Sequence, residues 1–189
     1  MTTGILLLAA GRSRRFGSDK RVANLADGQT LLRATLKRIF DTSLPVQICL
    51  RLDDTALQLE LEKEGLRCVR CDRADDGMGA TLAQGVAAMP DWDAVVVMLA
   101  DMPWVRSATL LALASNVTRD SIVVPVYQGR RGNPVAFGRA HFPGLARCQG
   151  DQGARGLVRS HVQQVLEVRV DDPGVLRDID RPDDLEPGL

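Results

Sequence analysis

GILLLAAG, residues 4–11, decides the fold of this chain. It is a short, continuous apolar run that ends at a glycine. Runs of this kind are typical of strands covered on both faces, as they are in parallel sheets. A second run of the same kind extends from Ala94 to Ala100. The two runs predict central strands of a parallel sheet.

Segments with helical and strand patterns alternate around these two runs. Leu31, Leu32, Leu36 and Ile39 recur at helical spacing, and Thr30 can cap that helix. Further helices are predicted over 53–64, 79–89, 107–114 and 153–160, and further strands over 46–50, 66–69, 121–125, 135–137 and 163–170. This alternation predicts an α/β fold with an open, doubly wound, mostly parallel sheet. Because no linker or repeat interrupts it, we expect one domain over residues 1–189, in which the later segments add an edge to the sheet and wall off a pocket.

Composition excludes several classes of protein. The 189 residues contain 24 Lys and Arg against 24 Asp and Glu, and this balance argues against a nucleic-acid partner, which would select a basic chain. The hydrophobic content of 45% is that of a globular protein. The apolar runs are far shorter than the roughly 20 residues that a membrane-spanning helix needs. Because the N-terminus lacks the basic region of a signal peptide, we expect a cytoplasmic protein.

Four cysteines occur, and two of them, Cys68 and Cys71, have the spacing of a zinc or redox motif. A structural zinc site needs a second pair of ligands, and a thioredoxin-like site needs a helix that starts after the first cysteine. Neither feature is present in the sequence. We therefore expect ordinary free thiols.

The loop LAAGRSRRFGSDK, residues 8–20, follows the first buried strand. A loop in that position lies at the carboxyl edge of the sheet, where open α/β folds bind ligands, and its glycines let backbone N–H groups approach an anion. It is neither a Walker loop, because Ser18 rather than lysine follows Gly17, nor a Rossmann fingerprint, because Ser13 replaces the second glycine. Arg15 and Lys20 could contact several phosphate groups. The alternative is an exposed basic turn.

Acidic residues occur at two places that could meet at this edge. Asp101 directly follows the strand that ends at Ala100, so its carboxylate should project beside the loop. Asp178 and Asp180 lie on one side of an extended stretch, because side chains in such a stretch alternate with a period of two. Carboxylates suit a hard cation, and the three residues together could bind Mg²⁺. A solvated Asp101 without a ligand is the alternative.

The loop and five later segments resemble the MobA-like nucleotidyltransferases. All eight fixed positions of the family pattern L-A-A-G-x-S-x-R-x-G-x-x-K match between Leu8 and Lys20. The branch that makes the cytidylyl form of the molybdenum cofactor is matched by the segments GMGATL (77–82), LADMP (99–103), GRRGNPV (129–135), GDQGAR (150–155) and DIDRPDDL (178–185). The resemblance covers residues 4–185 and implies a Rossmann-like nucleotidyltransferase fold.

The resemblance implies transfer of CMP from CTP to the phosphate of a molybdopterin-type cofactor, with Mg²⁺ as cofactor and a recipient molybdoenzyme as a further partner. It makes Arg15, Lys20 and Asp101 candidate catalytic residues, and Asp101, Asp178 and Asp180 candidate metal ligands. The expected nucleotide-binding residues are Leu8, Ala10, Gly11, Arg12, Ser13, Arg15, Lys20, Gly77 and Thr81. The expected acceptor-binding residues are Gly132, Asn133, Pro134, Asp151 and Arg155.

Two positions depart from the family pattern. Thr81 replaces the usual serine, and Asn133 stands where the family often has histidine; Thr81 could instead only cap its helix. Ala10 adds a methyl group where guanylyl-transferring relatives have glycine, and this favours CTP over GTP. The alternatives are guanylyl transfer, transfer to another small acceptor, and a non-catalytic protein that binds and delivers the finished cofactor.

Overall fold

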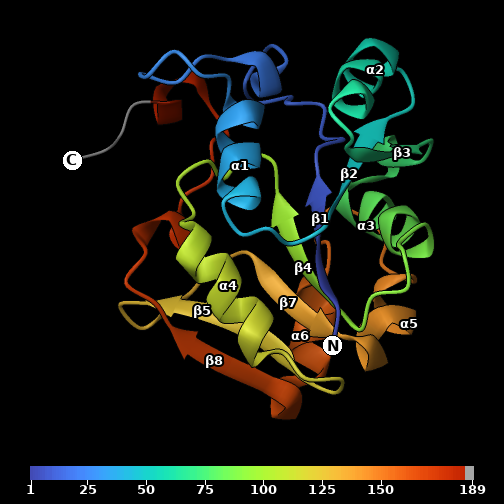
Figure 1. Cartoon of the computed structure of the whole chain (residues 1–189), viewed down its shortest axis with the longest axis vertical. Coiled ribbons are helices and arrows are strands. Elements are labelled where there is room, and N and C mark those ends of the chain that lie inside the picture. Colours follow the sequence, from blue (N-terminus) through green and yellow to red (C-terminus); the bar gives the residue numbers. More distant parts are fainter. Residues whose placement is uncertain (186–189) are drawn as a thin grey trace.

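A computed structural model describes residues 1–185 and contains one eight-stranded, mostly parallel sheet (Figure 1). The strands are β1 (Thr3–Leu8), β2 (Val46–Arg51), β3 (Arg67–Cys71), β4 (Ala94–Leu99), β5 (Ile122–Tyr127), β6 (Arg130–Arg131), β7 (Val135–Gly138) and β8 (Val165–Arg169). The helices are α1 (Leu31–Phe40), α2 (Thr55–Lys63), α3 (Met78–Ala87), α4 (Ser107–Asn116), α5 (Phe142–Leu145) and α6 (Arg155–Ser160). The predicted α/β class is confirmed.

Helices cover both faces of the sheet. On one face, Ile5 and Leu7 of β1 pack in a cluster with apolar residues of α1, α2 and α4. On the other face, Leu6 and Leu8 pack with residues of α3, α5 and α6. All of β1 is buried, which explains why its sequence is apolar without alternation. No helix within residues 1–185 is long and apolar enough to cross a membrane.

The strand order β3-β2-β1-β4-β7-β5 corrects the expectation for the later segments. Strands β1 to β4 are mutually parallel, and β8 extends the sheet by pairing in parallel with β5, as an added edge should. Strand β7 does not lie at an edge. It runs antiparallel between β4 and β5, where Val95 pairs with Phe137 and Ile122 pairs with the same residue. Its four residues show no pattern that identifies these two partners.

Local signals place the start of α1 correctly. Thr30 is the N-cap, and its side chain accepts a hydrogen bond from the backbone of Arg33 at 3.4 Å. The helix then buries Leu31, Leu32, Leu36 and Ile39, as the spacing predicts. Elsewhere the predicted bounds shift: β1 ends at Leu8 rather than Ala10, and α6 begins at Arg155 rather than Gly153. Helix α5 is short, and sequence reasoning missed it.

The four cysteines are free thiols, as expected. Cys68 and Cys71 both lie on β3, and residues three apart on a strand face opposite sides of the sheet. Cys68 accordingly packs with the cluster around α1, whereas Cys71 packs with the cluster around α3. Strand geometry therefore prevents the two thiols from converging on one metal ion.

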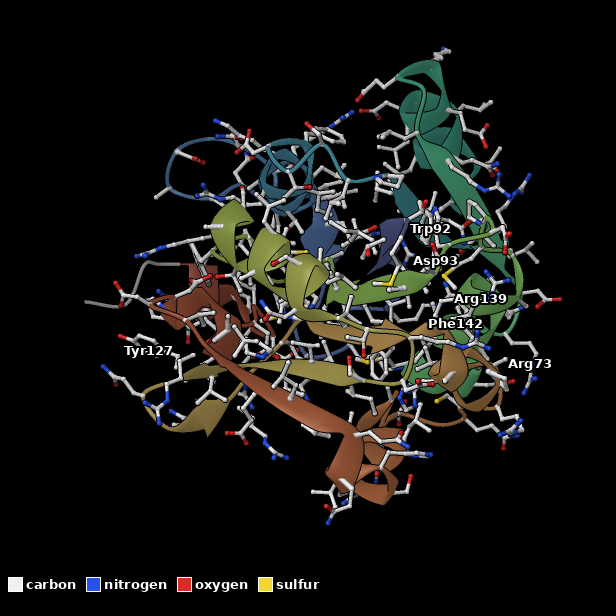
Figure 2. The ribbon with its side chains drawn as sticks, turned by 60° about the horizontal axis from the view of Figure 1, so that its bottom comes forward. Arg73, Trp92, Asp93, Tyr127, Arg139 and Phe142 are labelled. Carbon is white, nitrogen blue, oxygen red and sulfur yellow. The ribbon has the colours of Figure 1, made fainter. Side chains whose placement is uncertain are left out.

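The end of the sheet opposite the expected site is closed by polar and aromatic contacts (Figure 2). Trp92 is buried and lies against Gly4 of β1, where an added Cβ would overlap the indole ring. Asp93 accepts a hydrogen bond from the backbone N–H of Thr2 at 2.7 Å, and Arg139 donates to the Trp92 carbonyl at 3.2 Å. The carboxyl ends of β1 and β4 lie at the other end of these strands, where Leu8 and Leu99 line a cleft.

Candidate active site

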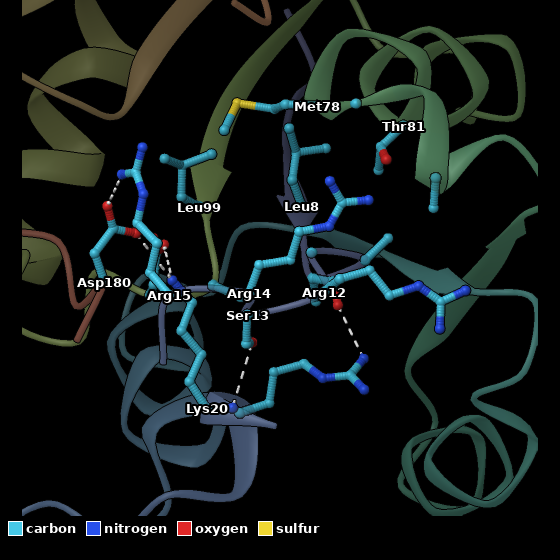
Figure 3. A pocket seen from close by; sticks show the side chains of 18 of the residues that line it. Leu8, Arg12, Ser13, Arg14, Arg15, Lys20, Met78, Thr81, Leu99 and Asp180 are labelled. Carbon is cyan, nitrogen blue, oxygen red and sulfur yellow. Dashed lines mark hydrogen bonds and ion pairs between the residues drawn. The ribbon is translucent and has the colours of Figure 1, made fainter. Parts of the chain in front are cut away.

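A cleft of about 450 Å³ lies at the carboxyl ends of β1 and β4 (Figure 3). The loop of residues 8–20, here called the signature loop, forms much of its wall. The predicted site residues that line the cleft are Leu8, Ala10, Gly11, Arg12, Ser13, Arg15, Lys20, Gly77, Thr81, Asp101, Asp151 and Asp180. The sheet therefore brings together segments that are up to about 170 residues apart in the sequence, at the edge where α/β folds bind ligands.

The signature loop turns around Ser13, which has a positive φ of 51°. The Ser13 carbonyl accepts hydrogen bonds from the N–H groups of Phe16 and Gly17, and its hydroxyl accepts one from the Lys20 N–H at 3.3 Å. Phe16 is buried in a small cluster with Leu31 and Ile179, and this anchors the tip of the loop. The loop is therefore held in a defined conformation rather than being an unanchored turn.

Three carboxylates meet beside this loop. Oxygen atoms of Asp101, Asp178 and Asp180 lie within 4.8 Å of one another, close enough to hold one metal ion. The backbone brings them together, because the Ile179 N–H donates to the Asp101 carbonyl at 3.0 Å. Ile179 itself points into the core, so Asp178 and Asp180 both face away from it. Asp180 lines the cleft, whereas Asp178 is exposed and does not line it. We call these three residues the carboxylate cluster.

Lys20 enters the carboxylate cluster from the signature loop. Its Nζ donates to Asp101 Oδ2 at 2.7 Å and to the Ile179 carbonyl at 2.6 Å, and lies 3.5 Å from Asp180 Oδ1. Arg15 donates to Asp180 Oδ2 at 2.8 Å, but 73% of its side chain is exposed. Both cations that we expected on phosphate groups thus also pair with the expected metal ligands.

Asp101 is the most enclosed member of the carboxylate cluster. Burial raises the pKa of its carboxyl group, and the nearby Lys20 ammonium opposes that shift. Its Oδ1 atom is buried and finds no hydrogen-bond partner among residues 1–185. A buried carboxylate oxygen without a partner is costly unless a cation or donor reaches it. The cluster therefore fits a hard divalent cation, for which carboxylate oxygens are the preferred ligands.

Arg12 extends across the opposite side of the cleft mouth. It donates to Asp53 at 3.0 Å and to Asp75 at 2.7 and 2.9 Å. This pairing lowers the pKa of Asp75. Sequence reasoning placed Arg12 on the nucleotide but missed both partners, which lie in loops after other strands. Both ion pairs of Arg12 are exposed and so contribute little to stability. A bound anion could therefore displace either carboxylate from the guanidinium.

Small residues and α3 form the inner wall. Ala10 lies at the end of the apolar run, and Thr81 lies within α3, where it is buried and lines the cleft. The suggestion that Thr81 only caps the helix is wrong, because the N-cap is Gly77. Gly77 has a φ of 107°, and an added Cβ would approach the Gly150 backbone to 2.5 Å. Only glycine fits there without strain.

The expected acceptor-binding residues are not gathered in the same cleft. Asp151 lines it, but Gly132, Asn133, Pro134 and Arg155 do not. The Asn133 N–H donates to the Val175 carbonyl at 2.8 Å, so this turn is tied to the segment that leads to Asp178. Arg155 is exposed at the start of α6. Any acceptor that touched these residues would extend beyond the described cleft.

Sequence reasoning missed a group of four charged residues at the base of the signature loop, of which Arg21 lines the cleft. Arg21, Asp19, Arg51 and Asp54 form ion pairs at 2.5–2.9 Å. Arg21 and Asp54 are both almost fully buried. The adjacent carboxylates at Asp53 and Asp54 offered a signal, but nothing in the sequence indicates which of them turns inward.

Comparisons with known proteins agree with this architecture. Purine catabolism protein PucB of Bacillus subtilis (strain 168) is 30% identical over 195 residues, which cover 96% of this chain and 93% of PucB. The crystal structure of Rv0371c from Mycobacterium tuberculosis H37Rv superposes with a TM-score of 0.83 at 31% identity, covering 97% of this chain and 95% of that one. Rv0371c has also been solved in complex with manganese, and that structure has a TM-score of 0.81 at 30% identity over 97% and 96% of the two chains.

A more distant structure shares the fold alone. Molybdopterin-guanine dinucleotide biosynthesis protein A from Archaeoglobus fulgidus superposes with a TM-score of 0.69 at 18% identity, covering 96% of this chain and 94% of that chain. The family model of the MobA-like NTP transferase domain matches residues 5–165, which include the signature loop and Asp101. The chain therefore belongs to the MobA-like NTP transferase family and is a nucleotidyltransferase of that family.

Proposed function

We propose that this nucleotidyltransferase moves CMP from CTP to the terminal phosphate of a molybdopterin-type cofactor. An acceptor phosphate oxygen forms the new bond to the α-phosphorus of CTP, and the bond from that phosphorus to pyrophosphate breaks. The attacking phosphate is already ionised at neutral pH, so the step needs no general base. The observation that best supports this chemistry is the carboxylate cluster beside the cationic signature loop, with Asp101 and Asp180 lining the same cleft as the loop.

The enzyme's main task in such a reaction is to bring polyanions together and align them. Lys20 and Arg15 lie where they could leave their carboxylate partners for nucleotide phosphates. Lys20 is mostly enclosed, with 14% of its side chain exposed, so its charge is screened less by solvent than that of Arg15. We assign Lys20 to charge that develops at the α-phosphate and Arg15 to nucleotide binding.

Asp101, Asp178 and Asp180 would hold the divalent metal ion. A bound Mg²⁺ neutralises phosphate charge and polarises the phosphoryl group that is attacked. The buried Oδ1 of Asp101, which no described residue hydrogen-bonds, supports this assignment. The manganese complex of the relative Rv0371c supports a divalent ion more generally, without distinguishing Mg²⁺ from Mn²⁺.

We assign the nucleotide base to the inner wall of the cleft. The Ala10 methyl group would crowd a purine more than a pyrimidine, and the Thr81 hydroxyl could hydrogen-bond the smaller base. The acceptor would then reach Asp151 and extend towards Gly132, Asn133, Pro134 and Arg155. The name of PucB places that relative in purine catabolism without stating its substrate, so the acceptor is proposed from the family resemblance.

The decisive experiment measures pyrophosphate release from each of the four NTPs with Mg²⁺ and a molybdopterin-type acceptor. We expect release with CTP that depends on both the acceptor and the metal. Faster release with GTP would establish guanylyl transfer instead. Release only with another small phosphorylated acceptor would overturn the cofactor assignment, and tight binding of the finished dinucleotide without any release would indicate a carrier protein.

A further inference from the structure

Arg21 uses all of its hydrogen-bonding capacity inside the protein. Its Nε and Nη2 donate to Asp19 at 2.8 and 2.6 Å, and its Nη1 and Nη2 donate to Asp54 at 2.5 and 2.7 Å. The fifth bond runs from Nη1 to the Ala9 carbonyl at 2.9 Å. A guanidinium has five N–H donors, so none remains for a substrate. Arg15 differs from Arg21 in this respect, because its side chain is exposed and has a single partner within the described part of the chain.

The partners of Arg21 belong to the two ends of the signature loop and to a neighbouring strand connection. Ala9 precedes the loop tip, Asp19 follows it, and Asp54 lies in the turn after β2. Ala9 also donates its N–H to the Cys49 carbonyl of β2 at 2.9 Å. The guanidinium thus closes the loop across its base and fastens that base to the central sheet.

Lys20 is the residue directly before Arg21, and the two side chains reach different places. Asp19 caps the short turn Lys20–Val22 by accepting a hydrogen bond from the Arg21 N–H at 3.1 Å. With that turn fixed, the Lys20 side chain extends to Asp101 and the Ile179 carbonyl. A shift of Arg21 would therefore move the origin of the Lys20 side chain relative to the carboxylate cluster.

Arg51 completes the anchor from the other side. It donates to Asp19 at 2.8 Å and to Asp54 at 2.9 Å, so both carboxylates are shared between two guanidinium groups. Burial raises the pKa of Asp54, and Arg21 opposes that shift. Such an enclosed ionic group tolerates few geometries, because each carboxylate must keep its donors to offset its loss of hydration.

We infer that Arg21 is a positioning residue that fixes the signature loop and presents Lys20 to the reacting phosphates. The kcat measurements that test this role rest on the proposed function, whereas the hydrogen-exchange measurement does not. A misplacement of about 1 Å in such a site can reduce turnover by about a hundredfold. Lysine at this position keeps the charge but cannot bridge three partners in fixed directions. Arg21→Lys is therefore the informative substitution.

The test compares Arg21→Lys with Arg33→Lys. Arg33 also binds two carboxylates, Glu60 and Glu64, but it links α1 to α2 outside the cleft. We expect kcat with the preferred NTP and acceptor to fall about ten- to a hundredfold in Arg21→Lys and to stay unchanged in Arg33→Lys. In the Lys20→Met background, the added Arg21→Lys change should have little further effect on kcat, because the two residues act together. Unchanged kcat in Arg21→Lys, or full additivity with Lys20→Met, would overturn the inference.

Two further measurements keep the result clear. If Arg21→Lys does not fold, Asp54→Asn tests the same anchor. It removes one carboxylate charge and leaves the bonds of Arg21 to Asp19 and Ala9 in place. A kcat equal to that of the parent would again contradict the inference. If the parent shows no turnover with any acceptor, the proposed function fails, and hydrogen exchange then tests the anchor alone. Exchange of the N–H groups in residues 9–20 should rise at least tenfold in Arg21→Lys but not in Arg33→Lys, and unchanged exchange would overturn the positioning role.

Discussion

Replacing Lys20 with methionine should affect metal binding and turnover in opposite directions. The Lys20 ammonium donates to Asp101 and lies 3.5 Å from Asp180, so it occupies the same carboxylates that would hold the divalent ion. A metal ion that binds there must compete with it. Methionine has a similar length without a charge or a donor, so Lys20→Met should tighten metal binding while it removes a positive charge from the phosphates.

The size of the effect follows from the bond that the metal has to displace. A hydrogen bond between charged groups contributes about 1.5–3 kcal/mol, and every 1.4 kcal/mol is about tenfold in affinity. Among residues 1–185, Lys20 makes one hydrogen bond of this kind to a carboxylate, which is the bond to Asp101. We therefore expect Mn²⁺ to bind Lys20→Met about 10- to 150-fold more tightly than the parent in the absence of nucleotide.

Titration with Mn²⁺, followed by the EPR signal of the free ion, measures this affinity directly. Lys37→Met is the matched control, because Lys37 is an exposed lysine on α1 that does not line the cleft. It should bind Mn²⁺ as the parent does. Equal or weaker Mn²⁺ binding by Lys20→Met would show that the ammonium does not compete with the metal, whereas tighter binding with undiminished turnover would refute its role toward phosphate.

Four other results are expected. Asp101→Asn should lower turnover at least tenfold at saturating Mg²⁺, about 1.4 kcal/mol or more of barrier, with an unchanged circular dichroism spectrum. The parent should prefer CTP to GTP by about 10- to 200-fold in competition kinetics, and Ala10→Gly should narrow that preference by admitting the purine. Gly79→Ala should reduce the free energy of unfolding by about 1–3 kcal/mol in denaturant titrations, because the added Cβ would come within 2.6 Å of the Gln149 backbone. Burial raises the pKa of Cys68 to about 11. Because only the thiolate reacts, Cys68 should be alkylated at pH 8 a few hundredfold more slowly than an exposed thiol with a pKa of about 8.5. Mass spectrometry would measure this rate, which should rise about tenfold per pH unit.

Much of the fold could be predicted because its signals are local. The apolar runs of β1 and β4 reflect burial on both faces, and the α1 pattern and its Thr30 cap depend only on residues close in sequence. The position of β7 could not be predicted, because its two partners are set by the completed sheet. A four-residue strand contains too little pattern to choose between an edge and an interior place.

The candidate site likewise has features that local sequence predicts and features that depend on the completed fold. The grouping of Asp101 with Asp178 and Asp180 could be predicted from strand ends and alternation, and the structure brings these residues together. The pairing of Lys20 with Asp101 could not, because it depends on the path of a loop and on a residue 81 positions away. The inward turn of Asp54 and the five bonds of Arg21 likewise depend on packing that no local pattern records.

Strand β7, which runs antiparallel inside the sheet, affects how two parts of the molecule are held together. Proteins open in contiguous cooperative units, so the contacts between two such units decide whether one can open without the other. Strand β7 joins β1–β4 to the part of the sheet formed by β5, β6 and β8. The carboxylate cluster takes residues from both parts, because Asp101 follows β4, whereas Asp178 and Asp180 follow β8. At the cluster the two parts are also joined directly, because the Ile179 N–H donates to the Asp101 carbonyl and Arg15 donates to Asp180. A divalent ion held by all three carboxylates would therefore be a further link between the two parts, and its binding would stabilise the folded chain against their separation.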